Sequence, residues 1–205
     1  MDNFVITIAR GFGSGGKQIG LALSKQLGIP CYESQILSMA SNYSGINKDL
    51  FFQVDEKLRG YHLIKRLMKS ANKDDIVEPT DKSFISDVNL YNIQAKIIKE
   101  LAKQQSCIII GKCANHLLRD YENTVSVYIE APRAFCVKNV IERLGVTEEE
   151  AHRMIYQTSY FSRPCNNLRT YEGHKHGSRR VCDDRRIYNI CRSADIRKIL
   201  SRKHS

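Results

Sequence analysis

A glycine-dense segment near the N-terminus constrains the fold more than any other part of the chain. Residues 4–20 read FVITIARGFGSGGKQIG. The first five of them form a short apolar run rich in β-branched side chains, which predicts a buried strand. From Lys17 onward apolar residues recur at helical spacing, and the glycines in between are too dense for the interior of a strand or a helix. The sequence therefore predicts a strand, a glycine loop and a helix in direct succession.

The glycine loop has the spacing G-x-x-x-x-G-K, which ends at Lys17. Between a strand and a helix, such a loop turns its backbone N–H groups inward, and the positive helix end adds to this site for nucleotide phosphates. The next position, where a Ser or Thr hydroxyl would hold Mg²⁺, is Gln18. The alternative is a glycine-rich turn that binds no ligand. The residues expected to bind the nucleotide phosphates are Gly11, Gly13, Ser14, Gly15, Gly16, Lys17 and Gln18.

The length and composition bound the class of protein. A chain of 205 residues suits one globular domain with room for a small inserted lobe. No apolar run approaches the roughly 20 residues of a membrane span. Asp2 and Asn3 precede the first strand, where a signal peptide would begin with a basic region. The seven cysteines form no C-x-x-C pair, which favours a reducing compartment, and we expect the cytoplasm.

The positive charge is concentrated at the C-terminal end. The formal net charge is +10, and residues 174–205 contain ten Lys/Arg and three Asp, so that this segment alone carries +7. The composition of the main body therefore does not predict a nucleic-acid-binding surface, whereas the basic C-terminal segment could bind nucleic acid. His174 and His176 lie in this segment, but the sequence offers no further ligands beside them, so no metal site is predicted.

Strand and helix patterns alternate through the rest of the chain. This alternation predicts an α/β fold with a parallel sheet flanked by helices, in which ligands bind at the C-terminal ends of the strands. Glu33, Lys112 and Glu130 each follow an expected strand directly. Residues 43–83 are weakly patterned and are expected to form an inserted helical lobe. The expected strands are 31–32, 106–111, 124–129 and 187–190, and the expected helices are 35–42, 49–58, 62–70, 84–105, 114–119, 134–144, 147–158 and 196–200.

Several segments together resemble a known family. The segments VITIARGFGSGGKQIG, LGIPCYE, CIIIGKCANHLL, VSVYIEAP and RLGVTEEEAHRMI, within residues 3–158, are similar in order and spacing to the cytidylate kinase-like proteins. The resemblance implies a single P-loop kinase-like domain over residues 1–205. Within it, the inserted lobe spans about 43–83, a lid about 145–175, and a divergent basic segment 174–205.

The resemblance also implies an activity and roles for individual residues. The activity is phosphoryl transfer from ATP, with Mg²⁺, to a small acceptor, foremost a nucleoside monophosphate such as CMP. Lys112 falls where the family has an arginine suited to a substrate phosphate, and Glu33 where it usually has aspartate. The implied catalytic residues are Lys17, Arg143 and Arg163, and the implied acceptor-binding residues are Glu33, Lys112 and Arg169.

The agreement with the family degrades after about residue 157, and two alternatives stay open. The lid is mostly unmatched, and His176 stands where the family has a tryptophan. A nucleotide-binding protein with little kinase activity would account for Gln18 and for this divergent lid. A nucleic-acid-binding role would rest on the basic C-terminal segment. Expected partners are small nucleotides and no membrane, while the sequence leaves the acceptor and the oligomeric state open.

Overall fold

The computed structural model describes residues 3–57, 76, 79, 81, 83–166, 181–182 and 187–189. Its sheet has the strand order β2-β3-β1-β4-β6-β5, and every neighbouring pair is parallel except β5 and β6. The parallel sheet predicted from the alternating patterns is thus confirmed. The strands are β1 (Val5–Arg10), β2 (Cys31–Tyr32), β3 (Cys107–Ile110), β4 (Thr124–Ile129), β5 (Val181–Cys182) and β6 (Ile187–Asn189).

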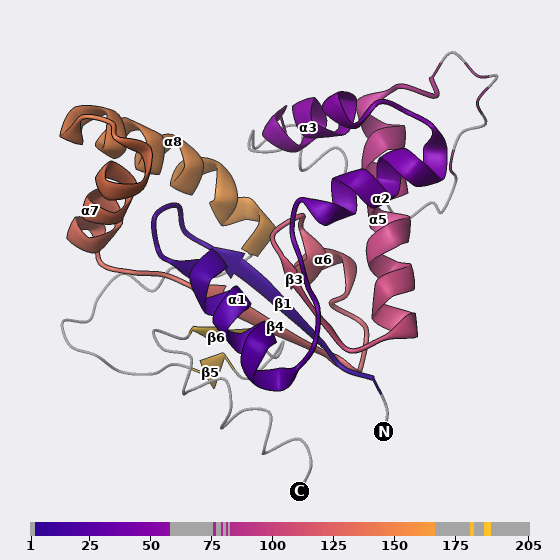
Figure 1. Cartoon of the computed structure of the whole chain (residues 1–205), viewed down its shortest axis with the longest axis horizontal. Helices are drawn as coiled ribbons and strands as arrows, with labels where there is room; N and C mark the ends of the chain where they lie inside the picture. The colour runs from indigo at the N-terminus through magenta and orange to yellow at the C-terminus, as the bar shows by residue number, and fades with distance from the viewer. Residues whose placement is uncertain are drawn as a thin grey trace, which may run out of the picture.

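Helices flank the sheet on both faces. In Figure 1, α2, α3 and α5 gather on one side of the picture, and α7 lies beside α8 on the other. The helix α1 packs against β1, β2 and β3. The described helices are α1 (Gly16–Leu27), α2 (Gln35–Ser44), α3 (Lys48–Lys57), α5 (Asp87–Gln104), α6 (Ala114–Leu117), α7 (Arg133–Leu144) and α8 (Glu148–Asn166).

The core divides between the two faces of the sheet because successive strand residues point to opposite sides. On one face, Ile6 and Ile8 pack with Leu23 of α1. On the other face, Ile109 packs with Ile98 of α5. All four residues of β3 are at most 1 % exposed, as a central strand of a parallel sheet requires. The central strand ends are therefore held rigidly where they meet the loops.

Two helix boundaries differ from the sequence-based expectation by more than two residues. The helix α5 begins at Asp87 rather than at residue 84, because the Ser86 hydroxyl caps it by accepting a hydrogen bond from the Asn89 N–H (3.2 Å). The helix α8 continues to Asn166 rather than ending near Thr158. Since no glycine lies between residues 146 and 166, the sequence has no glycine stop signal in this stretch.

Parts of several expected features lie outside the described residues. Of the inserted lobe, α3 is described, whereas the expected helix at 62–70 is not. The expected strand at 187–190 corresponds to β6, but the expected helix at 196–200 falls outside the described chain, as does most of the basic C-terminal segment. Within the described residues, no helix has the length and apolar character needed to cross a membrane.

A capping box begins α8. The Thr147 hydroxyl accepts from the Glu150 N–H (3.3 Å), and the Glu150 carboxylate accepts from the Thr147 N–H (3.1 Å). Thr147→Ala should lower the free energy of unfolding by about 1 kcal/mol, which corresponds to a melting temperature lower by about 2–4 °C in a chain of this size. Thr147→Ser retains the hydroxyl and should melt like the wild type. Equal losses in both variants would mean that the cap does not stabilise α8.

Candidate functional site

The glycine loop connects β1 to α1 through two left-handed glycines. Gly13 and Gly15 have φ angles of 79° and 80°. A Cβ atom at Gly13 would lie 2.7 Å from the backbone oxygen of Cys136 in α7, so this position has no room for a side chain. A Cβ atom at Gly15 would meet nothing within 4 Å. The loop is therefore packed against α7 at Gly13 and has open space at Gly15, beside the positive end of α1.

Internal hydrogen bonds shape the beginning of the loop. The Gly11 N–H donates to the Ile129 oxygen at the end of β4 (3.0 Å). The buried Ser14 hydroxyl donates to the Gly11 oxygen (2.8 Å). The N–H groups in the first turn of α1 have no intrahelical partners, as at any helix start. These bonds hold the loop in a shape that can receive an anion at the helix end.

The helix α7 holds the loop from outside. The Asn139 amide donates to the Gly13 oxygen (2.7 Å). With the Gln18 amide oriented to satisfy both of its groups, its nitrogen donates to the Gly15 oxygen (3.1 Å), and its oxygen accepts from Nη1 of Arg143 (3.0 Å). Arg143, expected from the family resemblance to be catalytic, thus lies beside the loop. Gln18 links it to the loop at the position where other P-loops carry a metal-binding hydroxyl.

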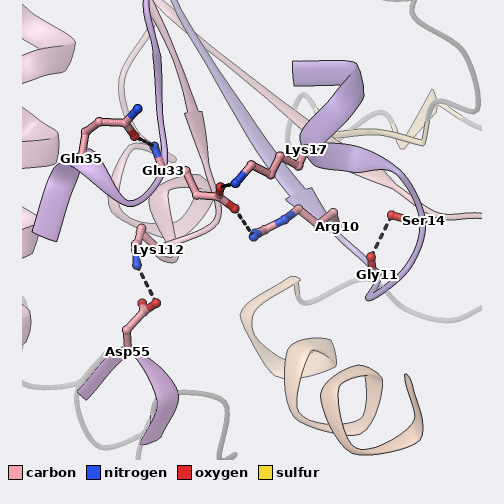
Figure 2. Close-up of polar contacts among 8 residues, drawn as sticks. All are labelled: Arg10, Gly11, Ser14, Lys17, Glu33, Gln35, Asp55 and Lys112. Carbon is pink, nitrogen blue, oxygen red and sulfur yellow. Dashed lines mark hydrogen bonds and ion pairs between the residues drawn. The ribbon is translucent and has the colours of Figure 1, made fainter. Parts of the chain in front are cut away.

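One carboxylate joins two cations in front of the loop. Glu33, directly after β2, bonds Lys17 Nζ through Oε2 and Arg10 Nη2 through Oε1, both at 2.7 Å. Figure 2 shows the two basic side chains pointing toward this carboxylate. The Gln35 side-chain oxygen accepts from the Glu33 N–H (3.0 Å) and helps to fix the turn. Glu33, predicted to bind the acceptor, is therefore paired with the phosphate-loop lysine in this structure.

The charges of Glu33 and Lys17 also shift the pKa of the neighbouring thiol, Cys31. Burial raises the pKa of Cys31, the Glu33 carboxylate raises it further, and Lys17 lowers it by a smaller amount. Burial likewise raises the pKa of Cys107, in β3, to about 11. Both shifts favour the neutral thiol over the nucleophilic thiolate.

The turn after β3 brings Lys112 to the same edge of the sheet. Gly111, Lys112 and Cys113 have consecutive φ angles of 71°, 56° and 54°, in the left-handed region that non-glycine residues rarely occupy. The Lys112 side chain is only 7 % exposed, and its Nζ bonds the Asp55 carboxylate of α3 (2.5 Å). The strained turn thus places a buried cation against α3, and strained backbone of this kind is often found at binding sites.

The structure brings together most of the predicted site residues that it describes. Lys17 meets Glu33 and Gln18 meets Arg143, whereas Lys112 pairs with a residue of the lobe. Arg163 lies in α8, where its side chain is not described, and Arg169 lies outside the described residues.

Sequence reasoning missed three contacting residues. These are Arg10, Asp55 and Asn139. Arg10 is the last residue of β1, so the strand-end argument that selected Glu33 and Lys112 could have found it. Asp55 and Asn139 lie within helices and give no comparable signal. Their contacts arise from the way α3 and α7 pack beside the loops.

The side chains of this site do not form a metal cage. No group of three or more His, Cys, Asp or Glu side chains that could hold a metal ion is found in the part of the chain that the structure describes. Both groups of the Gln18 amide are bonded to protein atoms.

A parallel sheet with a glycine loop between its central strand and a helix, and a lysine in the first helical turn, defines a P-loop kinase fold. The sequence matches the cytidylate kinase-like family over residues 5–191, and the chain belongs to this family. Membership identifies the protein as a kinase of nucleotides or other small molecules.

Among similar solved structures, one with a TM-score above 0.5 shows the same fold. An uncharacterized protein from Eubacterium ventriosum ATCC 27560 is similar over 98 % of each chain, with 20 % identity and a TM-score of 0.59. A shikimate kinase from Bacteroides thetaiotaomicron matches 81 % of this chain and 83 % of its own, with 12 % identity and a TM-score of 0.47. A deoxyadenosine kinase from M. mycoides matches over 98 % of each chain, with 12 % identity and a TM-score of 0.41. No curated protein matches the sequence.

Proposed function

We propose that the protein transfers the γ-phosphoryl group of ATP to the phosphate of a nucleoside monophosphate, with CMP as the first candidate. The observation that carries this proposal is the arrangement of two lysines at adjacent strand ends. Lys17 follows β1 through the open glycine loop, and the buried Lys112 follows β3, which pairs with β1. Lys17 would bind the donor phosphates and Lys112 the acceptor phosphate. Family membership supports the same reaction class.

The chemistry asks the protein mainly for positive charge and exclusion of water. An oxygen of the acceptor phosphate attacks the γ-phosphorus, and the bond from that phosphorus to the β–γ bridging oxygen breaks. ADP then leaves with the electron pair. A dianionic phosphate acceptor carries no proton on the attacking oxygen, so no general base is required. Arg143, beside the loop, and Arg163 and Arg169, in the proposed lid, would supply further charge.

The protein would bind the phosphates of the donor directly, whereas Mg²⁺ would be held by the phosphates and water. The space at Gly15, the first turn of α1 and Lys17 fit a triphosphate. We propose that Mg²⁺ accompanies the ATP, held by phosphate oxygens and water. Cys31, Cys107 and Cys136 form no disulfide, as the reducing cytoplasm would maintain them, and we propose that location.

A screen of acceptors tests the proposal directly. Purified protein, ATP and Mg²⁺ are incubated with each common nucleoside monophosphate and with a set of small metabolite alcohols, and ADP formation is measured. Acceptor-dependent turnover is expected with nucleoside monophosphates, CMP among the best. Turnover with an alcohol alone would show that the acceptor class is wrong while the kinase assignment stands.

The second candidate is a nucleotide-binding protein with little kinase activity. The bonds of the Gln18 amide to Gly15 and Arg143 favour it, because they occupy the side chain at the usual metal-binding position. Tight ATP binding without turnover against any acceptor in the screen would support this candidate. ATP-dependent phosphorylation of any acceptor, at a rate typical of kinases, would exclude it.

Gln18→Thr probes the same position. The threonine hydroxyl restores a direct Mg²⁺ ligand, so the variant should need several-fold less Mg²⁺ for half-maximal activity, with similar ATP affinity. Gln18→Ala serves as the matched control, because it also releases Arg143 but offers no metal ligand. If Gln18→Thr and Gln18→Ala have the same Mg²⁺ requirement as the wild type, other groups place the metal.

A further inference from the structure

Arg10 occupies the point where three loops of the site meet. It is the last residue of β1 and directly precedes Gly11. Its side chain is one-third exposed, and it reaches Glu33 at the end of β2 (2.7 Å). Figure 2 shows its guanidinium directed away from the glycine loop and toward this carboxylate. Neither the spacing of the glycine loop nor the family resemblance assigned this residue a role.

Two glycines make room for this one side chain. A Cβ atom at Gly16, in the first turn of α1, would lie 2.7 Å from the Arg10 Cβ. A Cβ atom at Gly111, in the turn after β3, would lie 2.5 Å from Arg10 Nη1. The stem of Arg10 therefore runs along the start of α1, and its guanidinium reaches the backbone next to Lys112. It lies between the proposed donor site and the proposed acceptor site.

The contact with Glu33 shows what kind of ligand this position fits. One oxygen of the carboxylate meets Arg10 and the other meets Lys17, each at 2.7 Å. The two cations are thus separated by a single small anion. A transferring phosphoryl group carries three oxygens on a similar scale, and a guanidinium can donate to two of them at once. Lys17 would meet the same group from the donor side.

We propose that Arg10 is a catalytic residue that contacts the transferred phosphoryl group, and that Glu33 is a positioning residue that aims Arg10 and Lys17 before nucleotide binds. This inference rests on the proposed function. In the transfer step, the bond from the acceptor oxygen to the γ-phosphorus forms as the bond from that phosphorus to ADP breaks. Negative charge spreads over the three equatorial oxygens at that point. Arg10 would stabilise it because its guanidinium, bonded to Glu33, lies between the start of α1 and the turn after β3.

The test compares Arg10→Lys and Arg10→Gln with Arg119→Gln as the control. Arg119 is exposed and pairs with its sequence neighbour Asp120, so its replacement should change neither kcat nor ATP affinity. With CMP as acceptor, Arg10→Gln should lower kcat by about 10²- to 10³-fold, as loss of a charge-stabilising donor does. The ATP affinity and the acceptor KM should stay within about threefold. Arg10→Lys should retain only a small part of the wild-type kcat, since an ammonium group lacks the paired N–H donors of a guanidinium.

A binding measurement gives a readout that does not depend on turnover. Aluminium fluoride with ADP and CMP mimics the transferred phosphoryl group. In the wild type, ADP should bind more tightly when aluminium fluoride and CMP are present. In Arg10→Gln this gain in ADP affinity should be absent, while ADP alone should bind as it does to the wild type. Loss of a residue with a merely structural role would weaken ADP binding equally with and without aluminium fluoride. Free guanidinium should partly restore kcat in Arg10→Ala, and thermal melting checks that each variant is folded.

The outcomes separate this inference from the proposed function. If the wild type turns over and Arg10→Gln keeps its full kcat and its response to aluminium fluoride, Arg10 is not catalytic and the proposed function stands. An increase in acceptor KM at unchanged kcat also overturns the inference, because Arg10 would then bind the acceptor rather than the transferred group. If the wild type phosphorylates none of the acceptors in the screen, the proposed function fails, and the proposed role of Arg10 fails with it.

Discussion

Replacing Lys17 with alanine is expected to reduce turnover about 10³-fold and to weaken ATP binding about tenfold or more. The ammonium group is half-exposed at the start of α1 and is held by Glu33 in this structure. When ATP binds, its phosphates would replace that carboxylate, and Lys17 would contact the β- and γ-oxygens as their charge increases. The measurements are steady-state kinetics with CMP and calorimetric titration with ATP.

The control for this prediction comes from the same helix. Lys25 is exposed in the last turn of α1, and Lys25→Ala should leave turnover and ATP affinity unchanged. The fold should survive the loss of Lys17, since Glu33 keeps Arg10 as a partner and an ion pair this exposed contributes at most about 1 kcal/mol. Unchanged ATP affinity and turnover in Lys17→Ala would refute the assignment of the glycine loop as the donor site.

The sequence was sufficient to predict the parts of the fold that depend on local pattern. β3 is short, rich in β-branched residues and apolar at every position, the pattern of a buried strand in a parallel sheet. The glycines at 11–16 could not continue either a strand or a helix, and Gly28 ends α1 in the left-handed conformation expected of a helix stop. These features follow from a few adjacent residues, so their prediction did not require the tertiary structure.

The site was predicted less completely because its contacts join residues distant in sequence. Glu33 was correctly placed at a strand end, but its pairing with Arg10 and Lys17 depends on how β2, β3 and β1 lie side by side. Asp55 lies on a helix of the weakly patterned lobe, and no local signal distinguishes it from a solvent-exposed carboxylate. The register that brings α3 over the turn after β3 is a tertiary property.

The packing of α7 against the glycine loop could not be predicted from the family pattern. Gln18 departs from the usual P-loop, and by sequence alone it was a weaker metal ligand. In the structure it joins Gly15 to Arg143, while Asn139 of the same helix bonds Gly13. The departure thus connects the loop to α7, which leads into the proposed lid. We expect movement of α7 to be transmitted to the loop through these two amides.

Lys112 and Asp55 should give opposite effects on acceptor binding when they are replaced. Lys112→Met removes the buried cation proposed to hold the acceptor phosphate, and the KM for CMP should increase about 10- to 100-fold, the range of a charged hydrogen bond. Asp55→Asn removes the anion that occupies Lys112 in this structure. Because the acceptor would no longer have to displace an ion pair, the KM should fall about fivefold, which corresponds to about 1 kcal/mol.

Steady-state kinetics at saturating ATP measures both effects, and Lys103→Met is the matched control because Lys103 is exposed near the end of α5. Thermal melting should show that all three variants are folded, since methionine keeps the apolar stem of Lys112 and Asp55 is only partly buried. If Asp55→Asn instead increases the KM as much as Lys112→Met does, Asp55 holds Lys112 in its binding position rather than competing for it. If neither variant changes the KM, the acceptor phosphate binds elsewhere, and the strained turn after β3 serves only to fasten the lobe.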